Sequence, residues 1–199
     1  MLSLELFPPL SNYLAFGADV IAQNQEYKDM LFDYFFTVFE TKRLGQMDKV
    51  SACKLMESIL LYLPGRVDNH LYQVLDIVRA ELLDVETYKK RVYNLFLLEI
   101  FVNAIYYNPV ATLQYLEHCK FLQRFFELWF QESHAFLRVH DKTLSIQALM
   151  KIVQLPTEHI PTALRNEEGL KYVLRGLISF FKYLPDAIKR IPFECHCDL

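Results

Sequence analysis

Hydrophobic residues recur along most of the chain at the spacing of one face of an α-helix. In the clearest case, Leu71, Val74, Leu75, Val78 and Leu82 follow one another at intervals of mostly three or four residues and form a single apolar stripe. Strand signals are nearly absent, because the chain has no Asn-Gly or Asp-Gly hairpin turn and no sustained apolar–polar alternation. The pattern therefore predicts an all-α protein.

The starts and stops of the apolar pattern predict the main helices and their approximate bounds. These helices are expected near residues 24–41, 47–63, 68–84, 86–107, 110–118, 120–133, 141–154 and 168–191. Short helical turns are expected near 17–23 and 157–165. Proline lacks a backbone N–H, so Pro185 should kink or shorten the last helix.

Turn and capping residues support these boundaries. Pro64-Gly65 should end one helix, because glycine tolerates the left-handed turn. Asp68 or Asn69 should cap the next helix by accepting a backbone N–H bond. Asp48 and Asp141 are expected to cap two further helices in the same way.

The helices pair into antiparallel hairpins over about 24–63, 68–107, 110–154 and 157–191. This spacing of roughly 40 to 45 residues is the period of HEAT or armadillo repeats. Ser145 stands where the HEAT pattern commonly has a basic residue. We expect a HEAT/armadillo-like helical-repeat solenoid of about four antiparallel helix pairs. No Gly/Ser/Pro-rich linker divides it, so residues 1–199 are expected to form a single continuous block, part of a longer solenoid.

The apolar stripes also predict which side chains form the core. The residues expected to be largely buried are Leu71, Val74, Val78, Leu95, Leu98, Val102, Phe125, Trp129, Leu144, Ala148 and Leu177.

Composition limits the classes of function. Hydrophobic residues are 53% and charged residues 23%, which excludes a disordered chain. The net charge of −3 argues against a nucleic-acid binder, and the aromatic rings alternate with Leu and Ile, as in helix interfaces, and not with Lys and Arg. Residues 1–100 hold 14 acidic against 10 basic residues, which could steer a basic partner toward an acidic face.

Cysteine usage and apolar runs bear on the compartment. The cysteines are widely spaced and do not resemble a disulfide framework, which favours a reducing compartment: Cys53, Cys119, Cys195 and Cys197. The longest uncharged run, 100–116, contains Asn and Pro, so no membrane insertion is expected. Glu5 and Pro8-Pro9 argue against a secretory signal.

Catalytic motifs are nearly absent, and GxGxxG, Walker-type, GxSxG and HExxH patterns do not occur. Ser51 and Lys54 match the SxxK spacing of a nucleophile and its base, without the partner motifs. Cys195-His196-Cys197 resembles a metal-binding motif, but three adjacent residues cannot easily provide three ligands to one tetrahedrally coordinated ion. We predict no enzyme, no cofactor and no catalytic or metal residue; a helical enzyme using Ser51/Lys54 or zinc at Cys195/Cys197 is the alternative.

Several strings, in a shared order, resemble the importin-beta superfamily of nuclear transport receptors, and in particular the branch of importins seven and eight. They are Pro8–Tyr13 with Glu26-Tyr27, Lys54–Leu61, Ala104–Pro109, Trp129-Phe130 and Phe136–Lys142. The resemblance covers about residues 7–183 and is to the C-terminal third of those receptors. Family members are several-fold longer, so the chain is expected to be a fragment.

The resemblance implies a curved HEAT-repeat solenoid that carries cargo through nuclear pores. Such receptors bind phenylalanine-glycine nucleoporins and release cargo when Ran–GTP binds, mainly at N-terminal repeats that have no counterpart here. Ribosomal proteins and histones are typical cargo, and the location is cytoplasm and nucleus, including the nuclear envelope and pore. No direct contact with nucleic acid is expected. Partner-binding residues should lie on second helices, although the sequence does not identify them; a helical-repeat scaffold unrelated to transport is the alternative.

Overall fold

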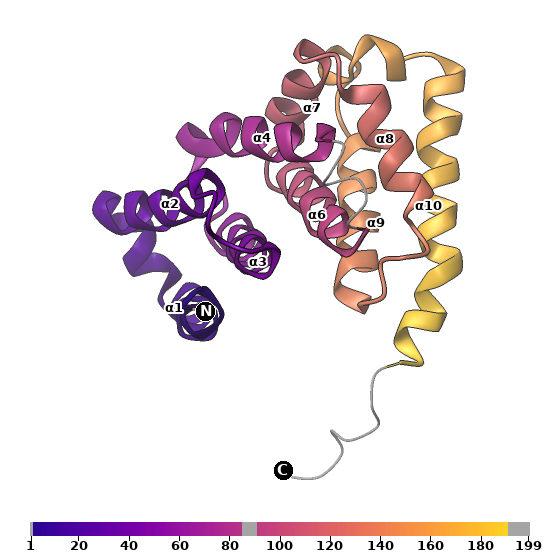
Figure 1. Cartoon of the computed structure of the whole chain (residues 1–199). Helices are drawn as coiled ribbons and strands as arrows, with labels where there is room; N and C mark the ends of the chain where they lie inside the picture. Colours follow the sequence, from indigo (N-terminus) through magenta and orange to yellow (C-terminus); the bar gives the residue numbers. More distant parts are fainter. Residues whose placement is uncertain (1, 85–90, 191–199) are drawn as a thin grey trace. The chain divides into compact units, whose positions relative to one another are not determined.

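The computed structural model describes residues 2–84 and 91–190, and these residues form nine α-helices and two short 3-10 turns, with no strand among them (Figure 1). The helices are α1 (Leu2–Gln23), α2 (Gln25–Glu40), α3 (Gln46–Tyr62), α4 (Asp68–Leu83), α6 (Arg91–Tyr107), α7 (Pro109–His118), α8 (Leu122–Gln131), α9 (Val139–Val153) and α10 (Glu167–Ile188). The 3-10 turns are η1 (Thr157–His159) and η2 (Thr162–Leu164). The predicted all-α, HEAT-like helical-repeat fold is confirmed.

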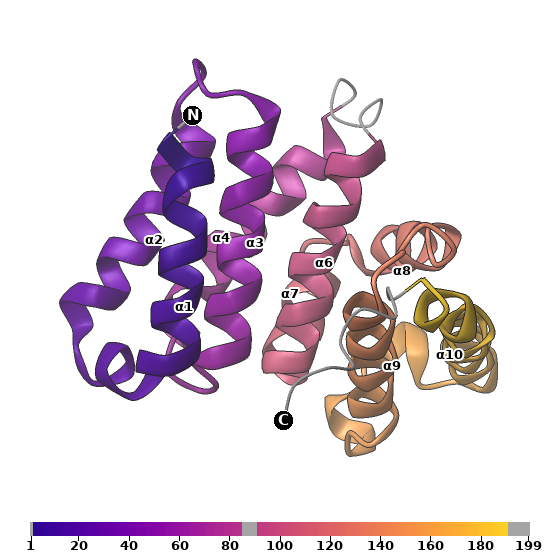
Figure 2. The same ribbon diagram turned by 90° about the horizontal axis from the view of Figure 1, so that it is seen from below.

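The chain divides into two compact units, Met1–Asn108 and Pro109–Leu199. In the first unit, α1 packs on α3 and α3 packs on α6, while α2 and α4 form a second layer against them (Figure 2). Because α3 has neighbours on both sides, its buried residues are spread around the helix and include Val50, Cys53 and Met56. Layers of antiparallel helices of this kind are the building principle of HEAT repeats.

In the second unit, α9 packs along α10, and α7 contacts both α8 and α9. Aromatic rings from α8 and α10 fill its core, with Trp129 fully buried and its ring centroid 5.8 Å from that of Phe180. The Trp129 indole N–H donates to Ser145 Oγ at 3.3 Å. Ser145, which departs from the HEAT pattern, therefore serves as the acceptor that a buried tryptophan needs.

The predicted helix bounds agree with the structure within about three residues for most helices. The predicted helix 86–107 is confirmed from Arg91 onward, and residues 86–90 lie outside the described residues. The predicted core residues are buried except for Leu95 and Leu177, which are half-buried. Leu177 lies between the packed side of α10, with Val173, and the exposed side, with Ile178.

The helical turn predicted near 17–23 is present as the last part of α1, but α1 begins at Leu2 and so includes a stretch, with Pro8 and Pro9 inside it, where no helix was predicted. Each proline removes one backbone hydrogen bond from the helix. The packing of α1 along α3, with Leu14 fully buried, offsets that loss. Gly17 leaves the helical conformation at φ −116° and ψ 18° and marks a kink.

The predicted hairpin 157–191 is also wrong, because this segment contains one α-helix preceded by η1 and η2. Pro156 precedes η1 and Pro161 precedes η2. Proline disfavours a helical conformation in the residue before it, which limits each element to a single turn. Pro185 lies in the last turn of α10, which ends at Ile188.

Asp48 and Asp141 do not occupy the capping position that the sequence predicts for them. Each is the third residue of its helix, because α3 and α9 begin two residues earlier. The Asp48 carboxylate accepts the Gly45 N–H at 3.0 Å, and the Asp141 carboxylate binds the Arg138 guanidinium at 2.8 and 2.9 Å. A carboxylate at this position reaches back to the helix start and also favours the positive end of the helix dipole.

The start of α4 is also held differently from the prediction. Val67 is the capping residue, and Asp68 is the first helical residue, without a side-chain cap. The Val67 N–H instead donates to the Tyr107 hydroxyl at 3.0 Å, and the Asn108 amide contacts Asp68 at 3.4 Å. The distinctive Tyr107-Asn108 pair therefore secures the corner between α3 and α4.

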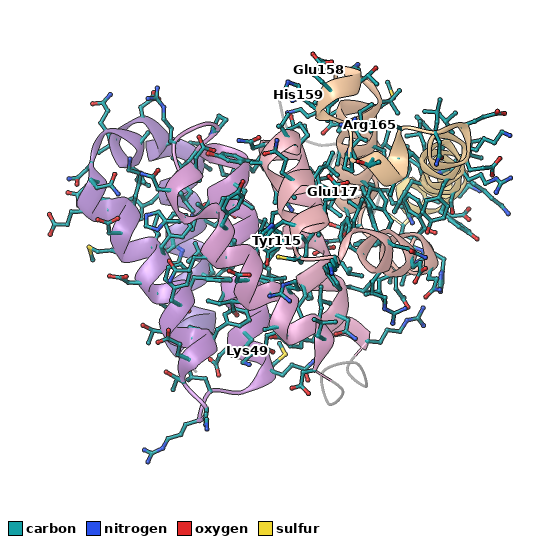
Figure 3. The ribbon with its side chains drawn as sticks, turned by 90° about the horizontal axis from the view of Figure 1, so that it is seen from above. Lys49, Tyr115, Glu117, Glu158, His159 and Arg165 are labelled. Carbon is teal, nitrogen blue, oxygen red and sulfur yellow. The ribbon has the colours of Figure 1, made fainter. Side chains whose placement is uncertain are left out.

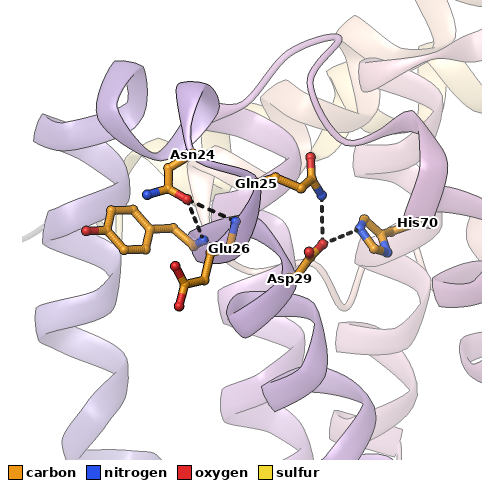
Figure 4. A network of polar contacts seen from close by, with 6 residues as sticks. Asn24, Gln25, Glu26, Asp29 and His70 are labelled. Atoms are coloured by element: carbon orange, nitrogen blue, oxygen red, sulfur yellow. Dashed lines mark hydrogen bonds and ion pairs between the residues drawn. The ribbon is translucent and has the colours of Figure 1, made fainter.

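Polar contacts at the start of α2 reach across to α4 (Figure 4). Asn24 Oδ1 accepts the N–H groups of Glu26 and Tyr27, as a capping residue does. Asp29 accepts a bond from Gln25 at 2.7 Å and lies 3.4 Å from His70 Nε2 on α4. These contacts fix the outer layer of the first unit.

Candidate partner-binding groove

Ser51 and Lys54 do not form a nucleophile–base pair. The Ser51 hydroxyl is buried and donates to the Met47 carbonyl at 3.1 Å. The Lys54 ammonium lies 5.2 Å from the centroid of the Phe96 ring. Each group has a structural partner of its own, so the geometry does not support the predicted enzyme alternative.

Cys195, His196 and Cys197 lie outside the described residues. Within the described ranges, no group of three His, Cys, Asp or Glu side chains is placed to hold a metal ion. Cys53 and Cys119 are free thiols, and Cys53 is fully buried, which raises its pKa. None of the described helices has the length and apolarity needed to cross a bilayer.

A partly buried polar cluster joins three helices of the first unit. Glu81 on α4 accepts from Lys49 on α3 at 2.5 Å and from the Tyr93 hydroxyl on α6 at 2.8 Å. Burial is the main cause that raises the pKa of Tyr93, and it keeps the phenol protonated as the donor. This cluster stabilises the packing of the helices; Tyr93 is only 2% exposed and offers no open reaction site.

An open groove of about 440 Å³ lies in the second unit between α8, η2 and the first half of α10. Its floor is apolar, and Leu122, Phe126 and Leu164 are buried there. Charged or amide side chains form its rim: Gln123, Glu127, Glu168 and Arg175. Tyr172 completes the wall, and burial together with the nearby Glu127 raises its pKa. An apolar floor with a polar rim suits an apolar side chain from a partner.

Gly169 lets the walls of the groove approach each other. A β-carbon at this position would lie 2.5 Å from the Leu164 Cα and 2.7 Å from the Ala163 carbonyl oxygen. Its N–H donates to the Asn166 side chain at 2.7 Å, which caps α10. The η2 backbone therefore rests directly on the first turn of α10.

Polar contacts hold the segment that forms the groove wall, and Figure 3 labels Glu117, Glu158 and Arg165, which take part in them. The Glu117 carboxylate on α7 accepts the Thr162 N–H at 2.9 Å. The Arg165 guanidinium donates to the carbonyls of Ile160 at 2.7 Å and Glu158 at 3.1 Å. These bonds shape an exposed connection that would otherwise have little to order it.

A second, smaller hollow of about 250 Å³ lies between α2 and α4 in the first unit. Its floor is Phe39, Ile77 and Ala80, and its rim carries three carboxylates, from Glu40, Glu81 and Asp84. A third hollow lies along α1, at Tyr13 and Phe16, where Phe16 is 90% exposed.

Sequence reasoning identified none of the groove residues as a site. The groove forms through tertiary packing of a 3-10 turn on two helices, and the apolar pattern carries no signal for such contacts. Gly169 is the available clue, because glycine in the first turn of a helix indicates close approach of another backbone.

Comparison with curated proteins identifies relatives over most of the chain. It is 31% identical to a probable importin-7 homolog of Dictyostelium discoideum, over 87% of this chain and 16% of that protein. It is 27% identical to an importin beta-like SAD2 homolog of Arabidopsis thaliana, over 94% and 19% of the two chains. It is 26% identical to importin-8 of Homo sapiens, over 76% and 15%.

No protein-family profile matches the chain, and neither does any solved structure. The chain spans less than a fifth of the length of these curated relatives. The relatives are named as importins in organisms as different as an amoeba, a plant and a vertebrate, and the described fold is of the helical-repeat type. Over most of its length the chain is therefore similar to a short part of importin-beta family proteins, in particular of the importin-7 and importin-8 branch, as a fragment of such a protein would be.

Proposed function

We propose that the chain is a C-terminal HEAT-repeat segment of a nuclear import receptor and that it contributes binding, without chemistry of its own. It acts in the cytoplasm, in the nucleus and at the nuclear pore. Its partners are protein cargo and nucleoporins, and Ran–GTP acts through repeats elsewhere in the receptor. The similarity to importins over most of the chain supports this proposal.

The groove between α8, η2 and α10 accepts a phenylalanine side chain of a phenylalanine-glycine nucleoporin repeat. The observation that carries this assignment is the apolar floor of Leu122, Phe126 and Leu164 beneath an open mouth. An aromatic ring placed there removes apolar surface from water, while the flanking glycine lets a peptide backbone lie close to the rim.

Basic cargo, such as ribosomal proteins or histones, is drawn to the first unit. Residues 1–100 carry 14 acidic against 10 basic residues, and Glu40 and Asp84 line the hollow between α2 and α4. Charge of this kind raises the rate of encounter with a basic protein and is screened by salt.

Titration of the chain with a phenylalanine-glycine repeat peptide tests the groove. The matched peptide has serine in place of each phenylalanine, and the measurement is fluorescence anisotropy of the labelled peptide. We expect binding of the phenylalanine peptide alone, and a loss of about tenfold or more in Ala163→Glu, because a charge then occupies an apolar groove.

Ala80→Glu is the matched control, since Ala80 is exposed like Ala163 but lies in the first unit. It should leave binding of the phenylalanine peptide unchanged. Equal binding of the two peptides, or no binding of either, would contradict the nucleoporin assignment and favour a helical-repeat scaffold unrelated to transport.

A further inference from the structure

One wall of the groove is a segment with little structure of its own. Ala163 and Leu164 belong to η2, a three-residue 3-10 turn whose internal support includes the bond from the Leu164 N–H to the Pro161 carbonyl at 2.9 Å. So short a turn has no cooperative helical bonding to keep it in place. Contacts from outside the turn therefore determine where the wall lies.

Besides its packing against α10 at Gly169, this wall has two kinds of polar contact. Arg165 bonds to carbonyls within the same connection, at Ile160 and Glu158, so it shapes the segment without tying it to another helix. Glu117 comes from α7, 45 residues earlier in the chain, and its carboxylate receives the Thr162 N–H. This bond joins the residue next to Ala163 to a separate helix.

We propose that Glu117 is a positioning residue of the groove: its bond to the Thr162 N–H holds η2 against α10 and so sets the distance between the groove walls and the affinity for an aromatic side chain. Glu117 does not line the groove. The affinity part of this inference rests on the function proposed above, whereas the effect on the position of the wall does not.

The chemistry of the contact suits this role. A carboxylate accepting a backbone N–H is a charge-assisted hydrogen bond, stronger than one between neutral groups. Glu117 is exposed, so its replacement creates no cavity in the core. Gly169 keeps the opposite contact tight, since any side chain there would push the Leu164 backbone away.

Three variants distinguish the effect of the Glu117–Thr162 hydrogen bond on the position of the wall from the effect of the negative charge of Glu117. Glu117→Ala removes the acceptor, Glu117→Gln keeps an acceptor oxygen and removes the charge, and Glu158→Ala is the control. Glu158 lies in the same connection, and its side chain is exposed while its backbone carbonyl holds Arg165. Glu117→Ala and Glu158→Ala remove the same charge, so any general electrostatic effect on the peptide is common to both.

The first measurement is amide hydrogen exchange of residues 162–164, which needs no ligand. We expect faster exchange there in Glu117→Ala, and wild-type exchange in Glu158→Ala, with Glu117→Gln close to wild type. Unchanged exchange in Glu117→Ala would overturn the inference whatever the peptide does.

The second measurement is affinity for the phenylalanine-glycine peptide. Loss of one hydrogen bond predicts a decrease of about threefold to tenfold in Glu117→Ala, and Glu117→Gln should recover most of it. Equal losses in Glu117→Ala and Glu158→Ala would overturn the inference, because charge would then explain both. If wild type binds no phenylalanine peptide, the proposed function fails, and the exchange measurement still decides the position of the wall.

Discussion

Buried polar side chains in this protein act through particular neighbours. Lys142, only 2% exposed, donates to the Ser133 carbonyl at 3.0 Å and lies 5.4 Å from the centroid of the Tyr183 ring. Lys142 thus ties α9 to the preceding connection and to α10. The sequence gives no signal of this role, because Lys142 becomes buried through residues distant in the chain. Ser145 is similar: its departure from the HEAT pattern is visible in the sequence, but its partner Trp129 is not.

The burial of Lys142 should make the free energy of unfolding depend on pH. Burial lowers the pKa of Lys142 below its usual 10.5; Arg190 lowers it further, and Asp141 and Asp186 oppose the shift. Between the lowered pKa and 10.5 the unfolded chain binds more protons than the folded chain. Stability due to this group therefore increases as pH rises through that window.

The test compares wild type with Lys142→Met by urea unfolding at several pH values from 7 to about 10.5. We expect the free energy of unfolding of wild type, relative to the variant, to increase with pH. A difference that stays constant or decreases over this range would contradict the buried position of the ammonium.

A second prediction concerns the contribution of the Tyr107 hydroxyl to stability. Tyr107→Phe removes the acceptor of the Val67 N–H and should lower the free energy of unfolding by about 0.5–1.5 kcal/mol. Tyr13→Phe is the control, because Tyr13 is 68% exposed and should change stability little. Equal effects of the two variants in urea unfolding at pH 7 would disprove the role of Tyr107 at the corner.

The same tyrosine links stability to alkaline pH. Burial is the main cause that raises the pKa of Tyr107 from 10 to about 12. The stabilisation from keeping this phenol protonated is complete below pH 10 and is lost as pH rises toward 12. The advantage of wild type over Tyr107→Phe should therefore decrease as pH rises from about 10 to about 12.

In helix α10, the glycines determine which side of the helix packs against the rest of the second unit. Its packed side carries Gly169, Val173, Gly176, Phe180 and Ala187, whereas Leu170, Leu174, Ile178 and Phe181 on another side are exposed. Apolar periodicity located this helix within about three residues but could not tell which apolar side packs. The glycines show the difference, since they allow close contact with η2 and with the Phe130 ring.

Gly176→Ala tests this packing. The added methyl group would overlap the Phe130 ring, which also packs on Tyr172 and Trp129, so we expect a loss of about 1–3 kcal/mol. Gly17→Ala is the matched control, because a β-carbon at Gly17 meets nothing within 4 Å. This control should be neutral or stabilise by up to about 1 kcal/mol. Thermal unfolding measures both, and an equal loss in the two variants would contradict the prediction.

The elements that the sequence misplaced share a physical cause. The length of α1 and the two 3-10 turns depend on a balance between proline's local effect and tertiary packing. In α1 packing on α3 prevails over Pro8 and Pro9, and near Pro156 and Pro161 the local restriction prevails. A local sequence pattern does not show whether proline's effect or tertiary packing is the larger. The groove that η2 helps to form could not be predicted for the same reason.

At the scale of the whole molecule, the chain has two compact units that meet in sequence at Asn108 and Pro109. A single residue, Asn108, separates α6 from α7. The expectation of one continuous repeat block across residues 1–199 remains a prediction. Stability in repeat proteins is the sum of contributions from individual repeats and from their interfaces, so a continuous block should unfold with shared transitions.

Because the chain has a single tryptophan, two spectroscopic signals can follow the unfolding of its two units separately. Trp129 is fully buried in the second unit, so its emission reports on that unit, whereas far-ultraviolet circular dichroism reports on helices of both. Recorded together during urea unfolding, the two signals should change at the same midpoint if the chain is one block. Helical signal that persists after the emission has shifted would instead mean that the first unit stands alone. The chain needs no added label to answer the question.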